Sequence, residues 1–95
     1  MEFEWDYSKE KANIAKHGHN FTDAIEAFQD PQGVSLEDSK HSDEESRFYW
    51  IGKTSKNKIL TVWYTRRGNK IRIIGCAEWR KFRSIYYEAA QLKWS

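Results

Sequence analysis

The sequence predicts an α+β fold with two N-terminal helices, an antiparallel β-meander of about four strands and a C-terminal helix. Three observations support this prediction. Helix-capping residues occur before position 30, runs rich in β-branched and aromatic residues follow, and an amphipathic stretch closes the chain. Because no repeat and no Pro/Gly-rich linker interrupts the sequence, we expect residues 1–95 to form one domain.

The two N-terminal helices are predicted from capping chemistry. Asp6 is a favourable N-cap for a helix over residues 7–17, and Gly18 suits the left-handed residue that ends a helix. A second, shorter helix is predicted over residues 22–28. Residues 3–5, which precede the first helix, are predicted to form a short strand.

The strands are predicted from composition and turn residues. A weak edge strand is expected at 33–38, followed by a mobile loop to residue 45. Three stronger strands are expected at 45–54, 58–67 and 70–77, because these runs are rich in β-branched and aromatic residues and are separated by turn residues.

The last two strands can be read in register if Gly68 and Asn69 form a two-residue turn. The predicted cross-strand pairs are Arg67–Lys70, Thr65–Arg72, Tyr64–Ile73 and Trp63–Ile74. Alternation gives a core face with Leu60, Val62, Tyr64, Ile71 and Ile73. The opposite, partly open face carries Thr61, Trp63, Thr65, Arg72 and Ile74.

Helical periodicity divides the C-terminal helix, predicted over residues 78–94, into two sides. The side expected in the core consists of Trp79, Phe82, Ile85, Tyr86 and Ala89. The side expected in solvent consists of Arg80, Arg83, Ser84 and Tyr87. A charged stripe of this kind is either a solvated face or a binding surface.

The charge is divided unevenly along the chain. Residues 1–46 carry four lysines against twelve acidic residues, a net charge of −8, whereas residues 47–95 carry twelve Lys and Arg against two acidic residues, a net charge of +10. All six arginines lie in the second part, which favours an electropositive face for nucleic acid or another polyanion. The alternative is that the two parts neutralise each other across the domain.

Several classes of protein are excluded by composition. No run of 18 apolar residues and no signal-peptide pattern is present, so we expect a cytoplasmic protein without membrane contact. A single cysteine cannot form an internal disulfide, and Cys76 is expected to be a small buried apolar residue. No Cys/His spacing suits zinc, so no metal and no cofactor are expected.

Two stretches, residues 3–31 and 47–88, carry a recognisable series of motifs. These are F-E-W-D at 3–6, K-H-G at 16–18, D-P at 30–31, V-x-Y-T at 62–65 and I-R-I-I at 71–74, with Asn13 in the first helix. In this order they resemble the BrnT family of type II toxins, over nearly the whole chain.

The resemblance implies a RelE/ParE-like fold, in which helices cover one face of an antiparallel sheet and the other face is exposed. It also implies a metal-independent ribonuclease that cleaves mRNA and arrests translation. The expected partner is a BrnA-like ribbon-helix-helix antitoxin, through which alone the protein reaches operator DNA. A homodimer or a toxin–antitoxin heterotetramer is expected.

One segment departs from the family pattern. After I-R-I-I the family usually reads S-A-R, whereas this chain has Gly75, Cys76 and Ala77, followed by the W-R-K variant of the motif. Arg80 and Lys81, one helical turn later, are candidates to restore the positive charge. The alternative is a non-catalytic module that binds RNA or its partner without cutting. A third reading, a DNA-gyrase poison on the related ParE fold, predicts DNA damage.

Metal-free RNA cleavage requires a base, an acid and cations for the phosphorane. The candidate catalytic residues are Arg72, Arg80, Lys81, Tyr87 and His17. The candidate RNA-binding residues are Arg47, Lys53, Trp63 and Arg83. We expect Arg72, Arg80 and Arg83 to meet in one solvent-facing hollow.

Several candidates have a simpler structural interpretation. His17 also suits the negative end of the first helix, Tyr87 a surface hydrogen bond, and Glu78, a further candidate base, the first turn of the last helix. Trp63 and Tyr49 either stack on bases or pack under the C-terminal helix.

Overall fold

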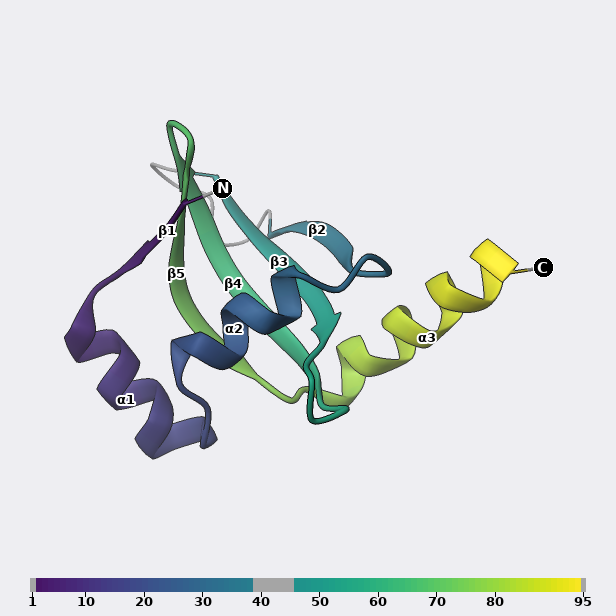
Figure 1. The fold of residues 1–95 in the computed structure, drawn as a ribbon, viewed down its shortest axis with the longest axis horizontal. Coiled ribbons are helices and arrows are strands. Elements are labelled where there is room, and N and C mark those ends of the chain that lie inside the picture. Colours follow the sequence, from purple (N-terminus) through teal and green to yellow (C-terminus); the bar gives the residue numbers. More distant parts are fainter. Residues whose placement is uncertain (1, 39–45, 95) are drawn as a thin grey trace.

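The computed structural model describes residues 2–38 and 46–94, and for residues 93 and 94 only the backbone. The elements run in the order β1 (Glu2–Trp5), α1 (Tyr7–His17), α2 (Phe21–Phe28), β2 (Val34–Asp38), β3 (Arg47–Lys53), β4 (Ile59–Arg67), β5 (Lys70–Ala77) and α3 (Arg80–Trp94) (Figure 1). The loop predicted after β2 lies outside the described residues. No helix of the described chain is long and apolar enough to cross a membrane.

The five strands form one mixed sheet with the order β1-β5-β4-β3-β2. Strands β2 to β5 are antiparallel neighbours, whereas β1 pairs in parallel with β5. The predicted antiparallel sheet of about four strands is therefore incomplete, because it lacks the parallel strand β1 at the edge beside β5. The strand predicted at residues 3–5 joins the sheet beside β5, and Phe3 packs against Phe28 with their ring centroids 5.3 Å apart.

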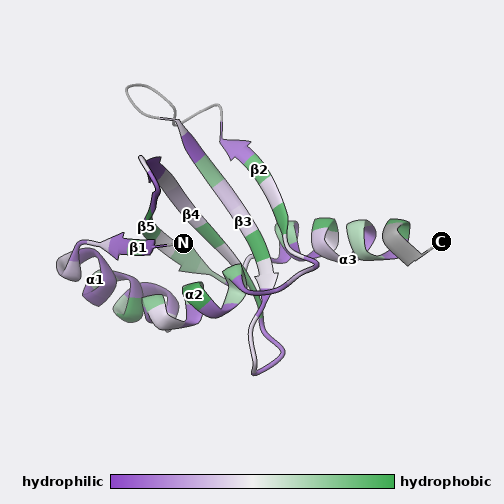
Figure 2. Cartoon of the chain, turned by 45° about the horizontal axis from the view of Figure 1, so that its top comes forward, coloured by the Kyte–Doolittle hydropathy of each residue, from purple (hydrophilic) through white to green (hydrophobic). Residues whose placement is uncertain are grey.

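Helices α1 and α2 cover one face of the sheet, and the main core lies beneath them (Figures 1 and 2). All five residues predicted for the core face of β4 and β5 belong to this core, together with Phe21, Ala24, Ala27 and Cys76. Cys76 is fully buried, which confirms the prediction for this cysteine, and burial raises the pKa of its thiol to about 12.

Helix α3 lies on the opposite face, where it contacts β2, β3 and β4, and its last turns project past the sheet (Figure 1). It begins at Arg80, two residues later than predicted. As expected, Tyr86 is buried and Trp79, Phe82 and Ile85 are partly buried, while the side with Arg80, Arg83, Ser84 and Tyr87 is exposed.

The loop between α1 and α2 is fixed by polar contacts. Asp6 caps α1, and Gly18 ends it with a φ of 75°, as predicted. Helix α2 is capped by Asn20, so it starts one residue earlier than predicted. The buried Asn13 donates a hydrogen bond to the backbone oxygen of His19 (2.8 Å), and its own oxygen accepts one from the backbone N–H of Cys76 (3.0 Å). Asn13 thus ties this loop to β5.

Candidate functional site

A group of aromatic rings fills the space between α3 and the sheet. The indoles of Trp63 and Trp79 are stacked, with centroids 4.8 Å apart and an interplanar angle of 7°. The ring of Tyr49 lies 5.0 Å from that of Phe82. Burial and a hydrogen bond to Asp38 raise the pKa of Tyr49. These contacts favour packing over base stacking for both sequence candidates.

The departure from the family motif makes room for this stack. A β-bulge between Trp63 and Tyr64 pairs Trp63 with Gly75, so the predicted Trp63–Ile74 pair is wrong. A Cβ atom on Gly75 would lie 2.2 Å from the Trp63 ring. Only glycine allows the indole to lie flat against β5, and a two-residue turn alone could not reveal the bulge.

Arg72 does not join the arginines of α3. Its guanidinium donates to Glu4 Oε2 at 3.0 Å, across the parallel β1–β5 pair. On β4, the partner of Arg72 is Thr65, whereas Ile59 lines the hollow beside Arg80 and Arg83. Thr65 and Ile59 are six residues apart on this strand, which corresponds to about 20 Å. The expectation that Arg72, Arg80 and Arg83 share one hollow is therefore wrong, because a neighbouring strand supplies Arg72 with its own carboxylate.

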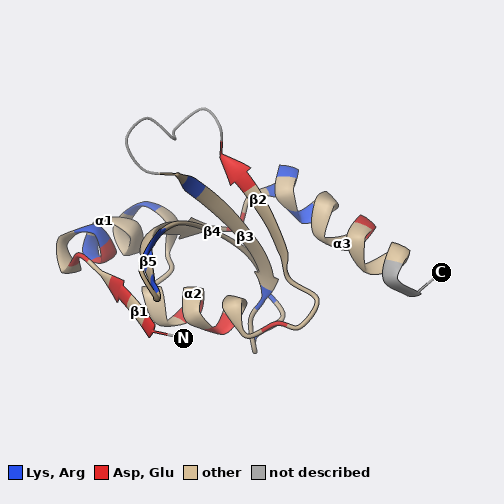
Figure 3. Cartoon of the chain, turned by 90° about the horizontal axis from the view of Figure 1, so that it is seen from above, with Lys and Arg blue, Asp and Glu red and all other residues tan. Residues whose placement is uncertain are grey.

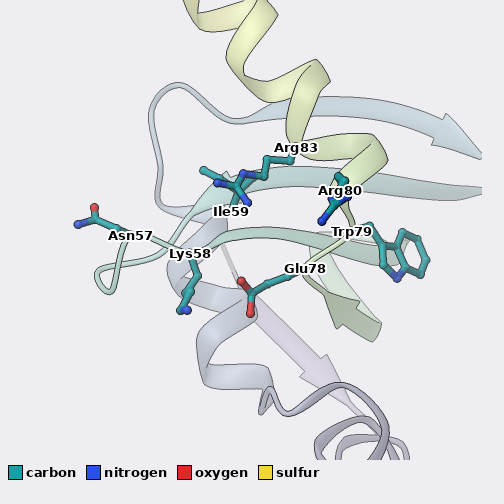
Figure 4. Close-up of a pocket in the computed structure, with 7 residues that line it drawn as sticks. All are labelled: Asn57, Lys58, Ile59, Glu78, Trp79, Arg80 and Arg83. Atoms are coloured by element: carbon teal, nitrogen blue, oxygen red, sulfur yellow. The ribbon is translucent and has the colours of Figure 1, made fainter.

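A hollow of about 300 Å³ lies between the start of α3 and the turn that joins β3 to β4 (Figure 4). Its polar lining residues are Asn57, Lys58, Glu78, Arg80 and Arg83, and Ile59 and Trp79 complete it. In Figure 4 the indole of Trp79 is directed away from the hollow, toward its stack with Trp63. Three cations and one carboxylate thus surround a solvent-accessible space.

The remaining candidates on and near α3 lie beside this hollow rather than in it. The Nζ atom of Lys53 lies 5.9 Å from the Tyr87 ring, and that of Lys81 lies 5.8 Å from the Phe82 ring. Both contacts are cation–π arrangements. Arg47, at the far end of β3, is opposite Asp38 and Thr65. Arg47 and Lys53 are therefore at opposite ends of one strand.

His17 lies beside the aromatic stack. Its ring meets the edge of Trp63, with centroids 5.8 Å apart. Burial, followed by the charges of Lys16 and His19, lowers the pKa of His17 and favours the neutral imidazole. His17 is absent from the lining of the hollow.

A part-buried hydrogen bond holds α3 to the rest of the domain. The Tyr86 hydroxyl donates to Asp30 Oδ2 at 2.5 Å, and the backbone N–H groups of Lys53 and Gln32 also donate to this carboxylate. Burial opposes the ionisation of Asp30, but these hydrogen bonds outweigh it and lower its pKa. Burial and the same bond raise the pKa of Tyr86.

Two parts of the site, Lys58 and His19, were not among the residues predicted from the sequence. Lys58 enters the hollow because the turn between β3 and β4 folds toward α3, which no local pattern indicates. His19 lies between two carboxylates, with its Nε2 2.8 Å from Glu78 Oε2 and its Nδ1 3.1 Å from Asp23 Oδ2. The i, i+4 spacing of His19 and Asp23 was a signal, but the contact with Glu78 spans 59 residues.

The charges segregate between some elements and mix on others. Acidic residues lie on β1, β2 and α2, basic residues lie on β5 and at both ends of β3, and both kinds lie on α1 and α3 (Figure 3). Within the described chain, no three His, Cys, Asp or Glu side chains come together as a ligand set for a metal ion.

Comparison with known proteins identifies the family. The chain is similar to the Brucella abortus ribonuclease toxin BrnT, whose crystal structure matches with a TM-score of 0.67 and 26% identity over 83% of this chain and 96% of that chain. None of the curated proteins compared with the chain matches it. The sequence profile "Ribonuclease toxin, BrnT, of type II toxin-antitoxin system" matches residues 5–82. The chain therefore belongs to the BrnT family of ribonuclease toxins of type II toxin–antitoxin systems, as the sequence motifs predict.

Proposed function

We propose that this protein cleaves mRNA without a metal ion, arrests translation, and holds the scissile phosphate in the hollow at the start of α3. The observation that carries the proposal is the convergence of Lys58, Arg80 and Arg83 on one solvent-accessible space. The proposed fold relationship is RelE/ParE-like, with the helix pair on one face and the nuclease site on the other.

The chemistry of the hollow suits a phosphate. Guanidinium groups bind phosphate oxygens bidentately and stabilise the extra negative charge of a phosphorane. The N-terminal end of α3, a helix of 15 residues, opens beside the same space and adds a favourable dipole for an anion. Lys53, which contacts the Tyr87 ring across β3 and α3, remains a candidate for binding the RNA backbone further along.

A second function is favoured by the departure from the S-A-R motif. The positions that carry a serine and an arginine in most of the family are occupied here by Gly75 and Ala77, which have no functional group and are buried. On this reading the protein binds RNA or its partner without cutting. Binding of an RNA oligonucleotide that stays intact over hours would support this reading over the nuclease.

The proposed partner is a ribbon-helix-helix antitoxin, in a toxin–antitoxin heterotetramer that contacts operator DNA through the antitoxin. Strands β1 and β2 form the two edges of the sheet. An edge strand offers unpaired backbone groups to an added strand or to a covering helix. Co-expression with the antitoxin should restore growth.

Growth and RNA integrity test the nuclease proposal directly. Wild type expressed without antitoxin should arrest growth and fragment mRNA, and purified wild type should cleave RNA in EDTA. The Arg80→Ala/Arg83→Ala variant should lose both effects. Lys9→Ala/Lys11→Ala, which removes two exposed cations from α1, is the matched control. If the arginine variant arrests growth as wild type does, the hollow is not the site.

A further inference from the structure

We propose that Glu78 is the general base of RNA cleavage at the hollow, and that His19, backed by Asp23, positions its carboxylate. The inference rests on the nuclease function proposed above and adds the proton-transfer group that the cations cannot supply. Arginine and lysine side chains stabilise charge, but a 2′-hydroxyl attacks phosphorus only as its proton is removed.

Glu78 occupies the short link between β5 and α3 and lines the hollow beside Arg80 and Arg83. Its side chain is 45% exposed, so one carboxylate oxygen can bind His19 while the other faces solvent. None of the other candidate bases named from the sequence lines this space: His17 lies against Trp63, and Lys81 and Tyr87 lie against other rings.

His19 is built into the structure as a positioning residue. Its side chain is only 12% exposed, and its two ring nitrogens face Asp23 and Glu78 at 3.1 and 2.8 Å. Its backbone oxygen accepts a hydrogen bond from the buried Asn13, which is itself bonded to β5. A group held at three points fixes the orientation of its neighbour, as preorganised catalysis requires.

The charges around Glu78 complete the arrangement. Lys58, Arg80 and Arg83 line the same hollow as Glu78, and His19 links Glu78 to Asp23. An imidazolium can donate to both carboxylates, whereas a neutral ring donates to only one. The chain of contacts runs from the Asp23 carboxylate through the His19 imidazole to the Glu78 carboxylate, and Glu78 is the acidic residue among those that line the hollow. A contact that only linked the loop to the helix would not require cations in the same hollow.

The proposed reaction balances without a co-reactant. Glu78 removes the proton of the 2′-hydroxyl, whose oxygen forms a bond to the adjacent phosphorus, and the bond from phosphorus to the 5′-oxygen breaks. The leaving 5′-oxygen takes a proton from water, and the proton held by Glu78 returns to solvent. The products are a 2′,3′-cyclic phosphate end and a 5′-hydroxyl end.

Kinetics on an RNA oligonucleotide in EDTA test this assignment. Glu78→Gln should lower kcat by about 100-fold or more, the usual contribution of a general base. Formate should restore part of the activity of Glu78→Ala, because a small carboxylate can replace the missing base. Glu88→Gln, an exposed carboxylate on α3, is the matched control and should cleave as wild type does.

The role of His19 is tested by two substitutions. His19→Ala should lower kcat about tenfold with little change in KM, and His19→Gln should recover part of the loss because an amide can still donate to Glu78. Thermal unfolding shows whether either variant has lost its fold.

The outcomes separate the inference from the function on which it rests. If wild type cleaves RNA and Glu78→Gln cleaves equally well, or if formate restores nothing, the Glu78 assignment is overturned and the nuclease proposal stands. If wild type leaves RNA intact under conditions in which it is folded, both proposals fail. A 3′-phosphate or 3′-hydroxyl product formed without a cyclic intermediate also overturns the assignment.

Discussion

Two regions on the α3 side of the sheet carry positive charge, and they differ in what neutralises it. At the strand ends, Arg72 is paired with Glu4 and has a side chain only 26% exposed. At the start of α3, Arg80 and Arg83 are exposed, and neither forms an ion pair with another described residue. A count of cations in the sequence therefore overstates the binding surface, because some are committed to the fold.

The largest expected effect comes from closing the space under Trp63. Gly75→Val places atoms inside the indole ring and should lower the free energy of unfolding by about 3 kcal/mol, the upper end for overpacking. Urea denaturation measures the change. The double variant Gly75→Val/Trp63→Leu should recover part of the loss. If Gly75→Val alone is as stable as wild type, Trp63 is not fixed against β5.

The next effect compares the two regions directly. Arg83→Ala should lower kcat/KM for RNA cleavage by about 100-fold, as expected for loss of one transition-state donor. Arg72→Ala should change it by less than about threefold, because its guanidinium is held by Glu4. Equal losses of kcat/KM in the two variants would show that Arg72 and Arg83 belong to one site.

A smaller effect concerns the contact that holds α3 in place. Tyr86→Phe removes a hydrogen bond to a carboxylate and should cost about 1.5 kcal/mol of unfolding free energy at pH 7. The folded-state pKa of Asp30 is lowered by its hydrogen bonds, so their stabilising effect is present above the ordinary carboxyl pKa of 3.8 and is lost as pH falls through the folded-state pKa. The difference between wild type and Tyr86→Phe should therefore shrink in strong acid. A constant difference down to the lowest pH at which both fold would contradict this.

The smallest effect is on the stability of the strand ends. Arg72→Ala should lower the free energy of unfolding by about 1 kcal/mol or less, since the pair with Glu4 is only partly buried. Added salt should reduce the difference. Lys70→Ala, whose partner Glu2 is 3.9 Å away and exposed, should cost still less.

The local structure was predictable where short-range chemistry decides it. Asp6 and Gly18 mark the ends of α1, and alternation in β4 and β5 identifies the core face. The bulge at Trp63 and the parallel pairing of β1 could not be predicted in this way. The alternation of buried and exposed residues along a strand does not show where a bulge occurs or which strand lies beside it. These features depend on contacts between residues far apart in the chain.

The candidate site was predictable in its residue types and not in its grouping. The sequence indicated that arginines on the last helix would be exposed, and they are. It could not indicate that Glu4 would occupy Arg72, or that His19 would meet Glu78, since these contacts span 68 and 59 residues. Candidate sets drawn from motifs therefore need a test of which members are already bonded to one another.

Helix α3 is fixed through its entry and first two turns, by Trp79 on Trp63, Glu78 on His19 and Tyr86 on Asp30. Its later turns reach beyond the sheet (Figure 1). A fluorophore or fusion protein joined to this distal end would be separated from the hollow by the projecting turns of α3 (Figure 1). The end of α3 is thus a convenient handle for immobilising or labelling the protein while its activity is measured.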